Sequence, residues 1–347
     1  MAIKPNMDAE VGRRIIPAEI DRQAKVKPNK IYASIPRSSD LSKGFQDVTI
    51  LDFAKSIDRL CEYLEPLIGY SCNFNTVAYY GPPDLRYLIV NVALSKLGHK
   101  ALFSAPRNSL SMHLHLFNVT ECNTILHARQ LDVLSMIGTH EATRHAIPEL
   151  SELLWATTEP RHYPYTKTFD EAKNDPYLIL HTSGSTGLPK PIVHTFGYTA
   201  AIDILAHVPP VNGRLSKLAV VCRPTRSLKA FPPWHVAGSI IFGVATSIWG
   251  DSMYVWPPAD RMPSAKDLLD IVEYGNCTEI LAPPTSFADI VKDPILYKKL
   301  DLVEWTMYGG GMYSLVHIHS HVGILTHLIQ DLLTQKLAMS WPKRQRL

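Results

Sequence analysis

From Val48 onward the chain alternates candidate helices with short runs of β-branched and aromatic residues, and this alternation limits the fold more than any other feature. Such alternation produces mostly parallel sheets, because each helix returns the chain to the same end of the sheet and covers one of its faces. We therefore expect an α/β protein with mainly parallel sheets covered by helices. The expected helices are 49–67, 84–97, 109–117, 264–274 and one after Gly197, and the expected strands are 76–80, 100–104, 123–127, 177–181, 252–256 and 278–282.

Breaker residues and polarity predict the remaining organisation. Gly98 should end the helix 84–97, since glycine readily adopts the conformation that terminates helices. Residues 1–45 are polar, contain prolines and lack sustained periodicity, so we expect an irregular N-terminal arm. Residues 159–175 are polar and carry two prolines, which predicts a surface connection between two α/β halves.

Composition and charge exclude several classes of protein. The 35 Lys and Arg against 32 Asp and Glu are mixed along the chain, so a nucleic-acid partner is not expected. The longest apolar run, 237–249, falls short of the ~18 residues of a membrane span. Residues 1–28 are rich in charge and lack the apolar core of a secretory signal. Five scattered cysteines without a CxxC pair indicate free thiols, no zinc site and a cytoplasmic setting.

The strongest chemical signal is the segment HTSGSTGLPK, residues 181–190, which directly follows the apolar strand candidate. Small residues at 183–187 let backbone N–H groups approach an anion, hydroxyls add donors, and Lys190 adds positive charge. The segment is not a Walker A loop, because Leu-Pro separates Gly187 from Lys190. A flexible Ser/Gly linker is the alternative, and the flanking YLIL and LPKP argue against it. The segment therefore predicts a polyphosphate-binding loop.

This loop resembles the phosphate-binding signature of the adenylate-forming superfamily, which includes acyl-CoA synthetases, luciferases and adenylation domains of nonribosomal peptide synthetases. Two further segments agree in order and spacing. FPPWHVAG at 231–238 resembles the motif between phosphate loop and acyl pocket, and MYGGG at 307–311 resembles the glycine-rich strand end beside adenine. The segment 78–109 is similar to fungal synthetase-like enzymes that couple adenylation to a carrier domain and a terminal reductase or thioesterase.

The resemblance implies that ATP and Mg²⁺ activate a carboxylic acid to an acyl-adenylate with release of pyrophosphate. Residues 182–187 would enclose the β- and γ-phosphates, Thr186 would help hold Mg²⁺, and Lys190 would offset charge on the departing pyrophosphate. His235 would lie between nucleotide and acyl pocket; for a lone histidine the alternative is a structural residue. The residues implied to bind nucleotide are Thr182, Ser183, Gly184, Ser185, Thr186, Gly187, Lys190, His235, Gly309, Gly310 and Gly311.

The family pattern stops after Gly311. The family's metal-binding glutamate, ribose-binding aspartate, small C-terminal domain with its catalytic lysine, and carrier domain are not found beyond this point. We therefore expect a partial adenylation domain at 46–311 and a non-family tail at 312–347. The codons for Gly-Met-Tyr at the junction can contain GTATGT, a frequent fungal splice donor, so the tail resembles a translated intron. We expect negligible adenylation by this chain, and a nonenzymatic nucleotide-binding remnant is the alternative function.

Overall fold

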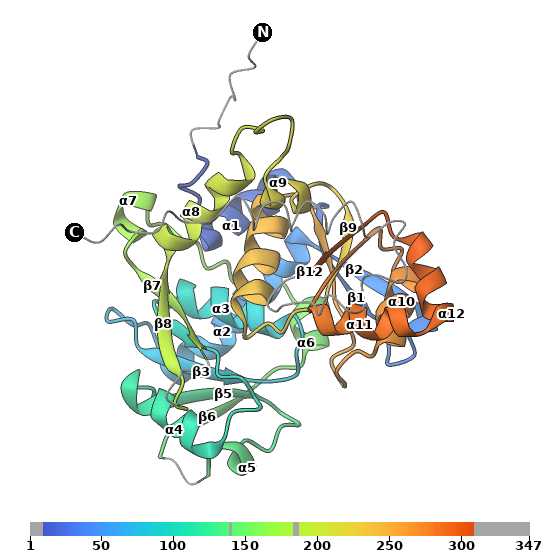
Figure 1. Cartoon of the computed structure of the whole chain (residues 1–347). Coiled ribbons are helices and arrows are strands. Elements are labelled where there is room, and N and C mark those ends of the chain that lie inside the picture. Colours follow the sequence, from blue (N-terminus) through green and yellow to red (C-terminus); the bar gives the residue numbers. More distant parts are fainter. Residues whose placement is uncertain (1–9, 139–140, 183–186, 309–347) are drawn as a thin grey trace, which may run out of the picture.

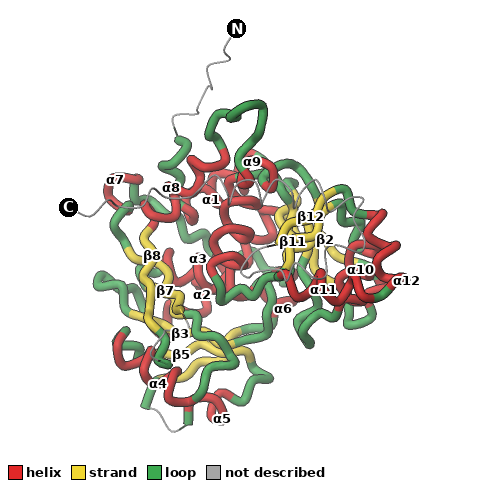
Figure 2. The backbone as a smooth tube through the Cα atoms, in the orientation of Figure 1, coloured by secondary structure: helices red, strands yellow, loops and turns green. Residues whose placement is uncertain are grey.

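The computed structural model describes residues 10–138, 141–182 and 187–308, which form an α/β structure with two six-stranded, mostly parallel sheets (Figure 1). The first sheet has the order β12-β11-β9-β10-β1-β2 and the second β6-β5-β3-β4-β7-β8. Only the pairs β1–β2 and β7–β8 are antiparallel within these sheets. Figure 2 shows the two sheets as separate groups of strands with α2 and α3 between them. The expected fold class is confirmed.

The elements have the following bounds. The first sheet contains β1 (Ile31–Pro36), β2 (Phe45–Thr49), β9 (Arg226–Lys229), β10 (Met253–Val255), β11 (Glu279–Ala282) and β12 (Trp305–Tyr308). The second contains β3 (Thr76–Tyr80), β4 (Lys100–Leu102), β5 (Thr124–Ala128), β6 (Thr143–Ile147), β7 (Pro176–Thr182) and β8 (Lys190–Thr195). The α-helices are α1 (Ile16–Val26), α2 (Ile50–Ile68), α3 (Arg86–Lys96), α4 (Leu110–Val119), α5 (Val133–Ile137), α6 (Leu150–Trp155), α7 (Phe169–Ala172), α8 (Phe196–Ala206), α9 (Lys217–Val221), α10 (Ala265–Tyr274), α11 (Pro284–Lys292) and α12 (Pro294–Lys299). Short 3₁₀ turns are η1 (Leu41–Lys43) and η3 (Leu300–Leu302), and η2 (Ala237–Trp249) is a π-helix.

Helix α3 joins the two halves of the core. It contacts β4 and β7 of the second sheet, as well as η2, which precedes β10 of the first sheet. Its residues are buried on every side from Arg86 to Ser95, which explains why its sequence shows little separation of polar and apolar faces. Helix α2, in contrast, is amphipathic and begins with a capping box between Thr49 and Asp52.

The expectation of an irregular arm over residues 1–45 is wrong for much of that range. Helix α1 buries Ile16 and Ile20, and β1 lies between β2 and β10 in the first sheet. The register pairs Ala33 with Val48 of β2 and with Tyr254 of β10, so one of the two partners of this strand lies far along the chain. The polarity of residues 1–45 does not predict pairing with a strand that is distant in the sequence. In Figure 1 these blue elements accordingly lie beside the yellow-to-red ones.

Other local expectations are confirmed with small boundary differences. The strand 76–80 matches β3, and Gly98 follows α3 with φ +78°, where an added Cβ would collide with the carbonyl oxygen of Ser71.

The segment 159–175 runs between β6 and β7 of the same sheet and therefore does not connect the two halves. It also contains α7 and a buried Tyr163, whose hydroxyl donates to Glu65 at 2.7 Å.

The apolar run 237–249 is the π-helix η2, and most of it is buried. In the part of the chain that the structure describes, no helix combines the length and the apolar character needed to cross a membrane.

Candidate functional site

The predicted phosphate loop connects two strands of an antiparallel hairpin. Residues Tyr177 to Leu180 of β7 are buried, and the strand emerges at its carboxyl end, where Thr182 is exposed. Strand β8 then returns antiparallel and places Lys190 directly opposite Thr182. Gly187 has φ +85°, and nothing lies within 4 Å of where its Cβ would be. The fold therefore holds a hydroxyl and an ammonium group at the two ends of one loop.

Four loop residues, Ser183, Gly184, Ser185 and Thr186, lie outside the described residues, as do Gly309, Gly310 and Gly311. The three glycines follow β12 directly, and β12 is parallel to β11 with Tyr308 in register with Ala282. The described part thus contains Thr182, Gly187, Lys190 and His235 of the expected nucleotide-binding residues.

The segment after β4 holds the last residues of β7 in place. The backbone N–H of Ala105 donates to Nε2 of His181 at 3.0 Å, and Nδ2 of Asn108 lies 3.2 Å from the same nitrogen. Because Nε2 accepts the backbone hydrogen, a neutral His181 carries its proton on Nδ1. Partial burial, together with the positive charge of Arg107, lowers the pKa of His181. We call this arrangement of Ala105, Asn108 and His181 the His181 clasp.

A buried polar network is hydrogen-bonded to the His181 clasp through Asn108. Asn108 also donates from Nδ2 to Oγ of Ser104 at 3.0 Å, and that hydroxyl lies 2.8 Å from Nδ1 of His113. The hydroxyl of Tyr80 lies 2.9 Å from the same nitrogen. Burial, with a smaller effect of His181, lowers the pKa of His113 to about 4, so this ring is neutral at pH 7. The network ties the loop conformation to strand β3 and helix α4.

His235 lies just before η2, in the other half of the core. Its Nδ1 accepts from the backbone N–H of Ala237 at 3.2 Å, and its carbonyl oxygen accepts from the hydroxyl of Ser239 at 3.0 Å. Partial burial and the positive charge of Arg107 lower the pKa of His235 as well. The charge of Arg107 therefore acts on both His181, in β7 of the second sheet, and His235, in the segment after β9 of the first sheet.

An aromatic contact couples these two halves of the site. The ring of Trp234 lies 5.6 Å from that of Tyr87 on α3, and Tyr87 in turn lies 4.9 Å from Phe103, directly after β4. The segment with His235 and the segment with Arg107 thus pack on the same aromatic side chain.

Arg107, Asn108 and His181 were not among the expected site residues. The available signal was their position: SAPRNS, residues 104–109, begins soon after a short parallel strand that pairs with β7. Ligands of parallel sheets bind beyond the carboxyl ends of strands, so loops after neighbouring strands converge on one site.

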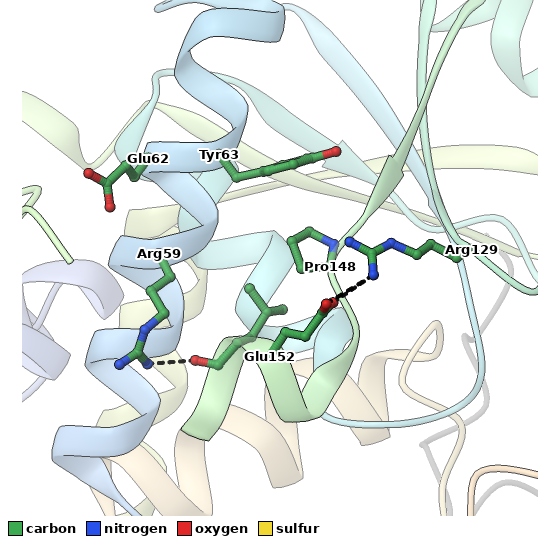
Figure 3. Close-up of a pocket in the computed structure, with 7 residues that line it drawn as sticks. Arg59, Glu62, Tyr63, Arg129, Pro148 and Glu152 are labelled. Atoms are coloured by element: carbon green, nitrogen blue, oxygen red, sulfur yellow. Dashed lines mark hydrogen bonds and ion pairs between the residues drawn. The ribbon is translucent and has the colours of Figure 1, made fainter. Parts of the chain in front are cut away.

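A surface pocket lies elsewhere, against α2 and α6 (Figure 3). Its main charged groups already have partners: Arg129 pairs with Glu152 at 2.8 Å, and Arg59 donates to the carbonyl oxygens of Leu153 and Ala156. None of the expected site residues lines it. We assign no binding role to this pocket.

These features define the class of protein. The chain belongs to the AMP-binding enzyme family, whose profile matches residues 20–329. This range extends beyond the boundaries at 46 and 311 that the sequence suggests for the domain.

Among the curated relatives, a carboxylic acid reductase of Neurospora crassa is 34% identical over 304 residues, covering 86% of this chain and 29% of the relative. The isocyanide synthase-NRPS hybrid crmA of Aspergillus fumigatus is 31% identical over 317 residues, covering 89% of this chain and 20% of the relative. The chain thus spans less than a third of the length of either protein.

Solved structures share the fold at low sequence identity. The luciferase-like enzyme of the mealworm Zophobas morio superimposes with a TM-score of 0.69 at 17% identity, covering 95% of this chain and 72% of that one. The N-terminal subdomain of Klebsiella oxytoca NpsA, in complex with 3-hydroxyanthranilyl-AMSN, gives a TM-score of 0.66 at 17% identity, with coverage of 89% and 70%.

Proposed function

We propose that this chain carries the ATP- and carboxylate-binding part of an acyl-adenylate-forming enzyme. In the reaction, a carboxylate oxygen attacks the α-phosphorus of ATP, an acyl–phosphate bond forms, and the bond to pyrophosphate breaks. The observation that carries the proposal is the β7–β8 hairpin, which pairs Thr182 with Lys190 across a Ser/Gly/Thr loop. Since the reactants are both anions, such a site acts by neutralising and positioning them.

The expected residues take the following roles in this proposal. Residues 182–187 enclose the β- and γ-phosphates, and Lys190 offsets the negative charge that develops on pyrophosphate as it leaves. His235 lies between the nucleotide and the acyl pocket, and it is neutral near pH 7 because its pKa is lowered. The glycines at 309–311 let adenine and the acyl group approach the backbone.

The proposed metal ion is Mg²⁺, with the hydroxyl of Thr186 as its protein ligand. Among the described residues, no group of three or more His, Cys, Asp or Glu side chains could hold a metal. A single hydroxyl ligand from the protein fits an ion bound mainly by phosphate oxygens and water, as Mg²⁺ usually is at nucleotide sites. When bound, the ion would neutralise part of the charge on the phosphate chain.

The substrate class and partner are inferred from relatives. The Neurospora crassa relative is named a carboxylic acid reductase. Another relative is named an adenylate-forming reductase, and a third an isocyanide synthase-NRPS hybrid. We infer a carboxylic acid as the substrate and a carrier domain as the acceptor of the acyl group. We further infer a cytoplasmic setting, in keeping with the five free cysteines.

Two measurements test the proposal. Isothermal titration with ATP and Mg²⁺ measures nucleotide binding, and exchange of labelled pyrophosphate into ATP, with a panel of carboxylic acids, measures adenylation. Binding with acid-dependent exchange supports the whole proposal. Binding without exchange for any acid would favour a nucleotide-binding remnant. A chain that folds cooperatively and binds no adenine nucleotide would overturn both.

A further inference from the structure

The His181 clasp fixes the backbone on both sides of an exposed arginine. Arg107 lies between Ala105, whose N–H is bonded to His181, and Asn108, whose amide contacts the same ring. Asn108 is held in turn by Ser104, which is fully buried. The conformation at residue 107 is therefore set by side chains that are themselves immobilised. Binding through Arg107 therefore needs no ordering of the backbone at this position, and the conformational cost is that of the exposed side chain.

Arg107 also has no counter-charge of its own among the residues that the structure describes. Within the described residues it forms no ion pair with a carboxylate, whereas many other arginines of this chain do, for example Arg86 with Asp84 at 2.8 Å and Arg261 with Asp267 at 2.8 Å. Its charge acts on His181 at the end of β7 and on His235 before η2. Each ring accepts a backbone hydrogen on one nitrogen, so each ring is uncharged and neither is a counter-charge for the guanidinium.

We propose that Arg107 is a substrate-contacting residue that binds the phosphate groups of the nucleotide, between the β7–β8 hairpin and His235. The inference rests on the proposed function and adds a phosphate ligand from the segment after β4. A guanidinium suits this role because its planar donors bind phosphate oxygens in pairs. Lys190, on the other strand of the hairpin, adds a second positive charge opposite Thr182.

The test compares Arg107→Met and Arg107→Lys with the unchanged 347-residue chain. Isothermal titration is carried out with Mg·ATP, AMP and adenosine. Arg37→Met serves as the matched control, because Arg37 is also exposed and donates to the neutral side chain of Gln46. We expect Arg107→Met to weaken Mg·ATP binding roughly ten- to a hundredfold and to leave adenosine binding unchanged. Arg107→Lys should recover part of the loss, and Arg37→Met should have no effect.

The AMP titration identifies the phosphate that is contacted. Weaker binding of both AMP and ATP indicates the α-phosphate, and weaker binding of ATP alone indicates the β- or γ-phosphate; both outcomes support the proposal. Equal affinity of Arg107→Met and the unchanged chain for ATP and AMP would overturn it while leaving the proposed function intact. Failure of the unchanged chain itself to bind nucleotide would overturn the proposed function, and this inference with it.

A ligand-free measurement checks the position of the side chain independently. The pKa values of His181 and His235, followed by NMR, should both rise in Arg107→Met and remain unchanged in Arg37→Met. If neither histidine responds, Arg107 does not lie between them, and the proposal is wrong.

Discussion

Thr182 and Lys190 face each other across the β7–β8 hairpin, as the last pair in its register before the loop. Strand β7 is also paired with β4 on its other side, whereas β8 forms the edge of its sheet. The backbone of Lys190 is therefore held by β7 while its side chain remains exposed. This arrangement leaves the ammonium free to approach a ligand without disturbing the core.

Replacing Lys190 by alanine should reduce catalysis more than nucleotide binding. In the proposed reaction the charge of Lys190 would be needed most as pyrophosphate departs, so its removal should raise the barrier more than it weakens ATP binding. Where the unchanged protein shows acid-dependent pyrophosphate exchange, we expect Lys190→Ala to lower the exchange rate at least about tenfold. The affinity for ATP should change less. The control is Lys217→Ala, an exposed lysine on α9. An unchanged exchange rate in Lys190→Ala would show that Lys190 does not take part in the reaction.

Replacing Lys229 by methionine should stabilise the protein near neutral pH. Lys229 is fully buried, donates to Thr246 and Ser247 at 2.8 Å each, and has no salt bridge within the described residues. Burial lowers the pKa of Lys229 to about 7, although Cys222 and Glu279 act in the opposite direction. Both hydroxyls keep their own bonds to the carbonyl oxygen of Phe242 when the amine is removed.

The pH dependence of this effect has a definite sign. The unfolded lysine titrates near ~10.4, so the unfolded state binds more protons between about pH 7 and pH 10, and the stability of the unchanged protein rises over that window. The advantage of Lys229→Met should be on the order of 4 kcal/mol at pH 7 and should shrink toward pH 10. Urea denaturation at several pH values measures it. An advantage that is constant with pH would contradict the assignment.

Lys96→Met should destabilise the protein strongly. The ammonium of Lys96 lies 2.7 Å from Asp21 and 2.9 Å from Asp58, and its side chain is 1% exposed. Burial alone would lower the pKa of Lys96, but the two carboxylates raise it. Removing the cation leaves two buried carboxylates without their shared partner, at a cost of roughly 3–5 kcal/mol. The free energy of unfolding in guanidinium chloride measures this loss.

The control for Lys96 is an ion pair whose lysine is exposed and whose carboxylate has a second cationic partner, Lys299. Lys266 pairs with Asp270 on α10, and its side chain is 73% exposed. Lys266→Met should cost less than about 1 kcal/mol. Equal effects of the two substitutions would show that burial does not strengthen the Lys96 cluster.

Gly98→Ala should destabilise more than Gly213→Ala. Both glycines have φ +78°, so each alanine pays the strain of the left-handed region, about 1–2 kcal/mol. At Gly213 the added methyl meets open space, whereas at Gly98 it collides with the backbone of Ser71. Thermal unfolding of the two variants separates the collision from the strain. A Gly98→Ala variant as stable as Gly213→Ala would show that the Ser71 segment can move away.

The sequence predicted the local parts of the fold well. The strand Thr76–Tyr80 and the helix that ends before Gly98 depend on residues within the segment itself, and both are confirmed. Strand β8 was not identified, because an edge strand with Pro191 lacks the apolar alternation of a half-buried strand. The segment 31–36 is expected to be irregular, but it forms a strand because it pairs with β2 and with the distant β10.

For the candidate site, the sequence predicts the loop after β7 and His235, and it does not predict the contacts of Ala105 and Asn108 with His181. Arg107 and Asn108 lie in a different loop from the recognised motif, and their relation to His181 depends on the pairing of β4 with β7. Periodicity and motif spacing do not encode which strands become neighbours. The roles proposed for Lys190 and Thr186 rest on the family resemblance, because sequence chemistry alone leaves them open.

The interleaved first sheet has a consequence for synthesis on the ribosome. The hydroxyl of Tyr32 in β1 donates to the carbonyl oxygen of Gly243, a residue 211 positions later. At roughly 5–20 residues per second, a nascent chain emerges with β1 many seconds before that partner exists. The second sheet, built from residues 76–195, can assemble during this interval. Strands β1 and β2 can pair with each other, but the backbone groups of β1 that pair with β10 still lack their partner. Chaperone dependence of the newborn protein should therefore be greatest before β9 and β10 leave the exit tunnel.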